Sequence, residues 1–118
     1  MEPISHFADA VIAGKTLYVS GLVATDGQGN IVGAGDVVEQ TRQIFRNLRR
    51  ILEAAGATPS DVAKLTIFMR DVDQRPLINP VRQEFFGAHR PASTLVGVSA
   101  LVRPELLLEI EAVAQLPD

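Results

Sequence analysis

The sequence predicts an α+β fold, in which two helices pack on one face of a mixed β-sheet. Two observations support this. Apolar, β-rich segments alternate with segments of helical periodicity in the order strand pair, helix, strand, helix, strand pair. Hydrophobic residues make up 47% of the chain, enough to bury a core. No Pro-, Gly- or Ser-rich stretch divides it, so we expect one domain over residues 1–118.

The first strong strand signal is TLYVSGLVAT at residues 16–25. DGQGN at residues 26–30 is dense in turn formers, so we expect a hairpin that returns through residues 31–33. The three glycines at positions 27, 29 and 33 do not have the G-x-G-x-x-G spacing, and no helix follows the strand directly. The segment is therefore not predicted to bind a nucleotide phosphate.

Residues 36–56 give the clearest helix signal. Asp36 is placed to be the N-cap, Glu39 completes a capping box, and Gly56 ends the helix. A stripe at helical spacing is expected to cover the sheet, and it consists of Val37, Ile44, Leu48, Ile51 and Ala55. The arginines off this stripe, at positions 42, 46, 49 and 50, form either a solvated face or a patch for a polyanion.

The second half of the chain predicts a central strand, a helix and two final strands. DVAKLTIFMRDV at residues 61–72 is the strand, with buried positions Val62, Leu65, Ile67 and Met69. Residues 73–87 predict a helix that Asp73 opens and Gly87 closes, and that Pro80 shortens or kinks. Residues 93–101 and 105–116 predict strands joined by VRPE. The open sheet face needs a cover, so we expect an oligomer.

The last strand carries two carboxylates on one face. Side chains alternate along a strand, which places Leu108, Ile110, Ala112 and Ala114 on the helix-facing side and Leu107, Glu109, Glu111 and Val113 on the other. The second face is either solvated or part of a subunit interface. In an interface, a partly buried carboxylate would have a raised pKa and could act as a general acid or base.

Composition argues against several classes of function. The net charge is −3, with one Tyr and no Trp, which does not suit nucleic acid binding. The absence of Cys removes disulfides and thiolate chemistry. His6 and His89 lack metal-ligand spacing, so we predict no metal site. No run approaches about 18 apolar residues, and the N-terminus lacks a basic signal region. We therefore expect a cytoplasmic protein with no membrane segment.

Two further polar residues near the first strand have more than one interpretation. His6 is either a surface residue or a titrating group at the mouth of a pocket. Ser20 is not part of a G-x-S-x-G nucleophile elbow. It is therefore interpreted as a structural, hydrogen-bonding group.

Several motifs occur together in an order that resembles the Rid family of reactive-intermediate deaminases, also called YjgF-like proteins or L-PSP endoribonucleases. The motifs are PISHFADAVIAGKTLYVSG, DVVEQTRQIFRNLRRILEAAG, DVAKLTIFMRDV, INPVRQEFF, RPAST and LLLEIEAVA. The resemblance implies a chorismate-mutase-like fold, assembled as a homotrimer with ligand clefts between subunits. It also implies hydrolysis of enamines and imines such as 2-aminoacrylate to a 2-oxo acid and ammonia, without a cofactor.

The resemblance assigns roles to individual residues. Glu109 matches the glutamate that orients the attacking water, Ser20 and Gly21 match the pair beside the ligand, and Asn79 matches the asparagine near the cleft. Two positions depart from the family pattern. Phe7 stands where active deaminases have tyrosine, and Ser93 in RPAST replaces the arginine that clamps the substrate carboxylate.

The change at Ser93 argues against typical 2-aminoacrylate activity. A hydrogen bond to a charged group contributes roughly 1.5 to 3 kcal/mol, so its loss weakens binding about tenfold to more than a hundredfold. Arg90, Arg103 or His6 are alternative groups for holding a substrate, and a substrate without an α-carboxylate is another possibility.

The rival hypothesis is a non-catalytic trimer that binds a small metabolite. Net acidity and few aromatics argue against ribonuclease activity.

Overall fold

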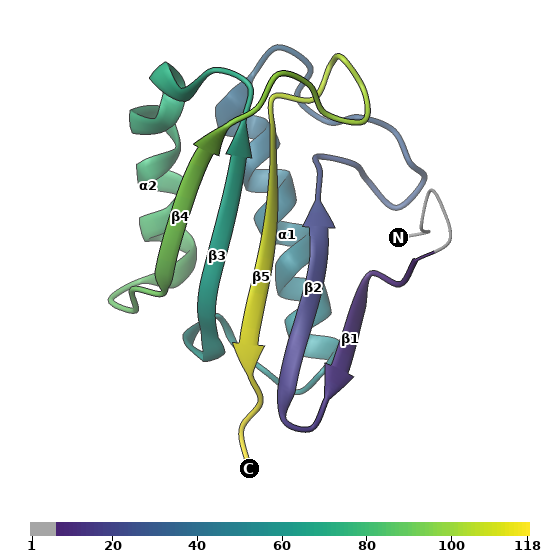
Figure 1. Ribbon diagram of the computed structural model, residues 1–118, viewed down its shortest axis with the longest axis vertical. Helices are drawn as coiled ribbons and strands as arrows, with labels where there is room; N and C mark the ends of the chain where they lie inside the picture. Colours follow the sequence, from purple (N-terminus) through teal and green to yellow (C-terminus); the bar gives the residue numbers. More distant parts are fainter. Residues whose placement is uncertain (1–6) are drawn as a thin grey trace.

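The computed structural model describes residues 7–118 and shows two helices on one face of a five-stranded sheet (Figure 1). The elements are β1 (Ala10–Ala13), β2 (Thr16–Leu22), α1 (Val37–Ala54), η1 (Pro59–Asp61), β3 (Val62–Met69), η2 (Val72–Gln74), α2 (Arg75–Phe86), β4 (Ala92–Gly97) and β5 (Leu108–Gln115). The strand order is β1-β2-β5-β3-β4. Only β3 and β4 pair in parallel, so the predicted mixed sheet and α+β class are confirmed.

Two predicted strand pairings are wrong. The hairpin partner of β2 is β1, joined to it through a tight turn at Gly14, whose positive φ of 62° suits glycine, and β5 pairs with β2 on its other side. Residues 31–33 do not form the expected return strand, because Ile31 makes only an isolated bridge to Thr25. The last two strands do not pair with each other either. β3 lies between them, because α2 carries the chain across to a parallel β4.

The helices begin and end close to the predicted positions. The Asp36 side chain caps α1 by accepting from the backbone N–H of Glu39, at 3.1 Å. Gly56 follows with a φ of 77°. Asp73 does not open α2, because it lies in η2, which Asp71 caps. α2 runs through Pro80 and stops at Gly87.

The core lies between the helices and the inner sheet face. The predicted inner residues of β5 are all buried, namely Leu108, Ile110, Ala112 and Ala114, as are the four predicted core residues of β3. On α1, the predicted stripe residues Val37, Ile44 and Leu48 are buried, while Ile51 and Ala55 are partly buried. Alternation along the strands and the helical stripe therefore predicted correctly which side chains face the core.

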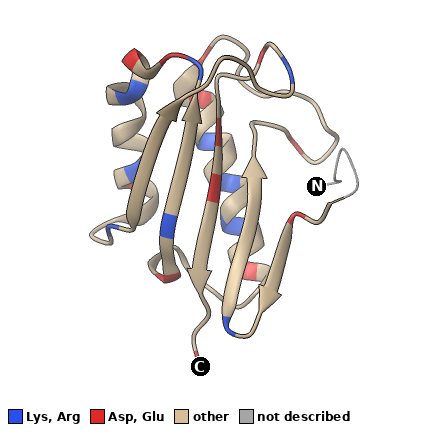
Figure 2. Cartoon of the chain, in the orientation of Figure 1, with Lys and Arg blue, Asp and Glu red and all other residues tan. Residues whose placement is uncertain are grey.

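The other face of the sheet has no helix over it (Figure 1). Val11, Tyr18 and Val113 are register partners across β1, β2 and β5, and Tyr18 is 51% exposed. Figure 2 shows that this face has few charges apart from the carboxylates of β5. Within residues 7–118, no helix has both the length and the hydropathy needed to cross a membrane.

Candidate functional site

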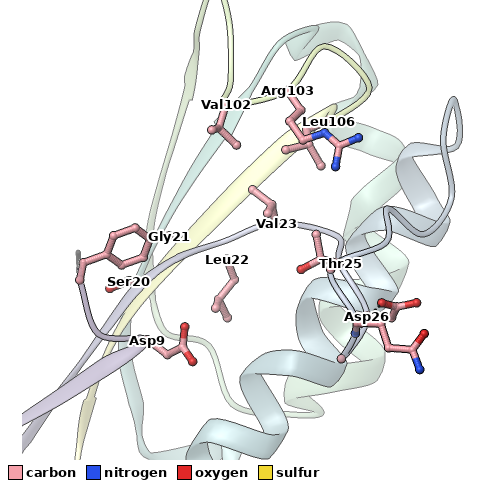
Figure 3. A pocket seen from close by; sticks show the side chains of 14 residues that line it. Asp9, Ser20, Gly21, Leu22, Val23, Thr25, Asp26, Val102, Arg103 and Leu106 are labelled. Carbon is pink, nitrogen blue, oxygen red and sulfur yellow. Dashed lines mark hydrogen bonds between the residues drawn. The ribbon is translucent and has the colours of Figure 1, made fainter. Parts of the chain in front are cut away.

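A pocket of about 370 Å³ opens where β2 ends. Its walls are Phe7, the end of β2 with the turn that follows, and the loop before β5. Four of the site residues named from the sequence line it, namely Phe7, Ser20, Gly21 and Arg103. In Figure 3, Val102 and Arg103 lie on the far side of the pocket from Asp9 and Leu22. The fold thus brings together two segments about 80 positions apart in the chain.

A buried amide on α1 holds the loop wall of this pocket. The side chain of Gln40 is fully buried, and its Nε2 donates to the carbonyls of Gly33, at 3.1 Å, and Glu105, at 2.9 Å. Its Oε1 accepts from the backbone N–H of Leu107 at 2.9 Å. Because a buried amide is costly to leave unpaired, these three bonds fix the loop relative to the helix.

Two more amides on α1 hold the opposite wall. Gln43 and Asn47 both donate to the carbonyl oxygen of Thr25, at 3.1 and 2.9 Å, and Nε2 of Gln43 also donates to Oδ1 of Asn47 at 3.2 Å. With Gln40 they form a stripe at spacings of three and four residues, which places all three on one side of the helix. This polar stripe was not predicted from the sequence, although polar residues that recur at helical spacing among apolar ones are visible there.

Glu109 does not itself line the pocket, but it lies against Gly21, which does. A Cβ built on Gly21 would lie 2.2 Å from Oε2 of Glu109, so the carboxylate occupies the space that the missing side chain leaves. The β2–β5 register shifts between Val19 and Leu22, next to this contact. Desolvation raises the pKa of Glu109, and the charge of Glu111 raises that pKa further. The half-buried carboxylate is therefore more basic than a surface one.

Polar groups around the end of β2 shape the backbone. The Ser20 hydroxyl donates to the carbonyl of Ala8 at 2.7 Å, which confirms a structural hydrogen bond at this residue. Asp26 accepts from the backbone N–H groups of Asn30 and Gln28, and these bonds lower its pKa. The Asp26 side chain therefore closes the turn at residues 26–30.

Asn79 and Ser93 do not line this pocket. Ser93 is on β4, the edge strand at the opposite end of the sheet order from β1. Its hydroxyl accepts from Nη2 of Arg82 on α2, at 2.8 Å. Partial burial lowers the pKa of Arg82. Asn79 is exposed and precedes Arg82 by three residues, so both lie on the same side of α2. Arg82 was not predicted from the sequence, because its contact with Ser93 depends on how α2 packs on β4.

Three residues, Arg103, Arg90 and His6, were predicted as possible substitutes for the clamp arginine. Arg103 lines the pocket but pairs with Glu105 at 3.1 Å. Arg90 is exposed and does not line the pocket. His6 lies outside the described residues. His89 is 2.7 Å from the carbonyl oxygen of Val62 through its Nε2. Nowhere in the described part of the chain do three His, Asp or Glu side chains gather as a metal site would require.

Three of the four arginines on the polar face of α1 interact with neighbouring side chains. Arg42 and Arg46 pair with Glu39 at 3.7 and 3.3 Å. The guanidinium of Arg49 lies over the ring of Phe85, 4.9 Å from its centroid. These contacts fit the solvated-face interpretation better than the polyanion patch.

Comparison with known proteins places this chain in a family. The sequence model of the family described as Endoribonuclease L-PSP matches residues 1–116. The chain is 37% identical over 112 residues to a 2-iminobutanoate/2-iminopropanoate deaminase of Dermatophagoides farinae, a match that covers 95% of this chain and 87% of that one. It is 38% identical over 112 residues to the 3-aminoacrylate deaminase RutC of Acinetobacter baylyi, covering 95% and 88% respectively.

A solved structure supports the same relationship. The protein YyfA of Yersinia pestis, described as a member of the conserved Rid protein family, superposes with a TM-score of 0.90 at 31% identity, over 97% of this chain and 90% of that chain. The match spans the sheet, both helices and the segments that line the pocket. The chain belongs to the endoribonuclease L-PSP family, the Rid family that its motifs resemble.

Proposed function

We propose that this protein hydrolyses reactive enamines and imines of small carboxylic acids to carbonyl compounds and ammonia, as a cytoplasmic homotrimer. The observation that carries the proposal is the half-buried Glu109 carboxylate, held against Gly21 at the edge of an apolar pocket. A carboxylate with a raised pKa is a suitable general base near neutral pH. The relatives named as deaminases of 2-iminobutanoate, 2-iminopropanoate and 3-aminoacrylate support the substrate class.

The proposed reaction uses water and one carboxylate. An enamine first tautomerises to its imine. Glu109 accepts a proton from water while the water oxygen attacks the imine carbon, and it passes this proton to the imine nitrogen, which gives a neutral tetrahedral carbinolamine. The hydroxyl proton of the carbinolamine then moves through Glu109 to the amine nitrogen, the C–N bond breaks, and ammonia leaves as the carbonyl forms. Glu109 is ionised again at the end of each turnover, and the proposed reaction needs no cofactor.

The trimer is supported by the uncovered sheet face. Exposed and half-buried apolar side chains, including Val11, Tyr18 and Val96, lie on a face that no helix covers. Monomers rarely leave such a face open to solvent. In the proposed trimer three such faces pack together. Each pocket, with Glu109 at its edge, then meets the Asn79–Ser93 side of a neighbouring subunit.

The rival function is a trimer that binds a metabolite without transforming it. Phe7 lines the pocket and offers a ring but no hydroxyl, and Ser93 offers no charge. Both features favour binding over catalysis. Turnover therefore has to be measured, and a carboxylate next to Glu109 on the same sheet face provides a matched control.

The test is ammonia release from 2-iminobutanoate, generated in the assay by an amino-acid oxidase. The wild type should accelerate ammonia release, and Glu109→Gln should slow it by about two to four orders of magnitude, the usual contribution of a general base. Glu111→Gln, on the same strand and face, should keep most of the activity. Equal rates for wild type and Glu109→Gln would exclude the proposed role. No acceleration by any form would favour the binding trimer.

A further inference from the structure

We propose that Arg82 is the residue that binds the substrate carboxylate, with the Ser93 hydroxyl and the Asn79 amide beside it. This inference rests on the proposed function and deepens it, because it names the charged group of a site in which serine occupies the clamp position. It makes the substrate an anion, and so excludes neutral imines as the main substrates.

The geometry places three polar groups of suitable chemistry at one edge of the sheet. Arg82 reaches from α2 to β4, where its Nη2 donates to Ser93 Oγ at 2.8 Å. Asn79 is on the same side of α2, one turn earlier. Asn79 and Ser93 are both exposed. A guanidinium, an amide and a hydroxyl together provide donors in the arrangement that binds carboxylates.

The charge of Arg82 has no counterpart within the described residues. The side chains at ion-pairing distance there are Lys15, Arg42, Arg46 and Arg103 with their acidic partners, and Arg82 is not among them. Arg49 is occupied by the ring of Phe85. Arg82 is half-buried and uses one bond, to Ser93. A desolvated cation without an anion is costly, so a carboxylate that binds there removes an existing penalty.

The contact also gives Ser93 a function. A serine is small enough to let the guanidinium of Arg82 reach the strand. Its hydroxyl oxygen accepts from Nη2 and so orients the guanidinium. An arginine at position 93 beside Arg82 would place two cations in contact. The pair Arg82 and Ser93 therefore supplies a single positive charge, carried on the helix instead of on the strand.

Binding of 2-oxobutanoate tests this without requiring turnover. This probe is the stable carbonyl product of 2-iminobutanoate, and 2-butanone is its analogue without the carboxylate. Arg82→Gln should weaken 2-oxobutanoate binding in an NMR titration about tenfold to a hundredfold, the loss expected for a charge-assisted bond. Arg82→Lys should be intermediate. The shifts caused by 2-butanone should not change, and KM for 2-iminobutanoate should rise more than kcat falls. Arg50→Gln, an exposed arginine on α1, is the control and should behave like the wild type.

Relocating the charge provides a second test if Arg82→Gln does not fold. The double variant Arg82→Ser/Ser93→Arg moves the guanidinium to the other side of the contact and should bind 2-oxobutanoate more tightly than Arg82→Ser. Unchanged affinity in a folded Arg82→Gln, or a folded double variant that binds no better than Arg82→Ser, would overturn the inference. If Glu109→Gln loses turnover while Arg82→Gln keeps the KM of the wild type, the proposed deaminase activity is supported and the proposed role of Arg82 is rejected. If Arg82 controls binding but the wild type releases no ammonia, the deaminase proposal fails instead.

Discussion

Two regions of the sheet differ in what they offer a ligand. The end of β2 has a shaped, mainly apolar pocket, and three buried amides of α1 hold its walls. The β4 edge presents the guanidinium of Arg82 with a hydroxyl and an amide nearby. In the function we propose, the pocket region supplies shape and a base while the β4 edge supplies charge. A single chain would then hold two halves of a site that neighbouring subunits complete.

The largest expected effect is on the walls of the pocket. In Gln40→Ala, the N–H of Leu107 and the carbonyls of Gly33 and Glu105 lose the fully buried amide that is their partner. Since each of the three lost hydrogen bonds contributes about 0.5–1.5 kcal/mol, the free energy of unfolding should fall by about 2–4 kcal/mol. Chemical denaturation measures this. Gln83→Ala, an exposed glutamine on α2, is the control, and an equal loss in both variants would contradict the special role of Gln40.

A smaller change should separate the shape of the pocket from its base. Gly21→Ala places a methyl group where the Glu109 carboxylate lies, and the carboxylate, at the end of a flexible side chain, has to move. We expect ammonia release to fall about tenfold or more, because small displacements of a catalytic group are costly. The melting temperature should change little. Full activity in Gly21→Ala would show that the contact does not position Glu109.

The smallest expected effect concerns the pH dependence of stability. The pKa of Glu109 is raised in the folded protein, so its contribution to stability is full below the unfolded pKa of about 4.3 and is lost as pH rises through the folded value. Glu109→Gln cannot ionise. Its melting temperature should exceed that of the wild type by a small amount at pH 7, and the difference should vanish near pH 4. If the melting temperature of the wild type instead rose relative to that of Glu109→Gln as pH increased, the direction of the Glu109 pKa shift would be contradicted.

Local sequence patterns predicted much of the fold. Alternation in β5 placed Glu109 on the uncovered face, and the Asp36 cap and Gly56 located α1, because capping and side-chain periodicity depend on nearby residues. Strand pairing was predicted poorly. β4 pairs in parallel with β3 across α2, and that choice depends on how distant elements pack.

The candidate site was predictable in part through the family resemblance. That resemblance assigned Phe7, Ser20 and Gly21 to a ligand cleft, and Arg103 was a possible substitute for the clamp arginine. All four residues line one pocket. Gln40, which joins α1 to residues 105 and 107, was not selected, because its partners are more than 60 positions away. Arg82 was missed because its contact with Ser93 exists only once α2 packs on β4.

In the proposed trimer, Glu109 of one subunit and Arg82 of its neighbour act in the same cleft. The most direct measurement is ammonia release, at low 2-iminobutanoate, from trimers assembled by mixing Glu109→Gln and Arg82→Gln chains. If the halves meet between subunits, about a quarter of the clefts in an equal random mixture contain both native residues, and activity should rise well above that of either variant alone. Activity equal to the average of the two separate variants, in a mixture whose oligomers have exchanged chains, would contradict the claim.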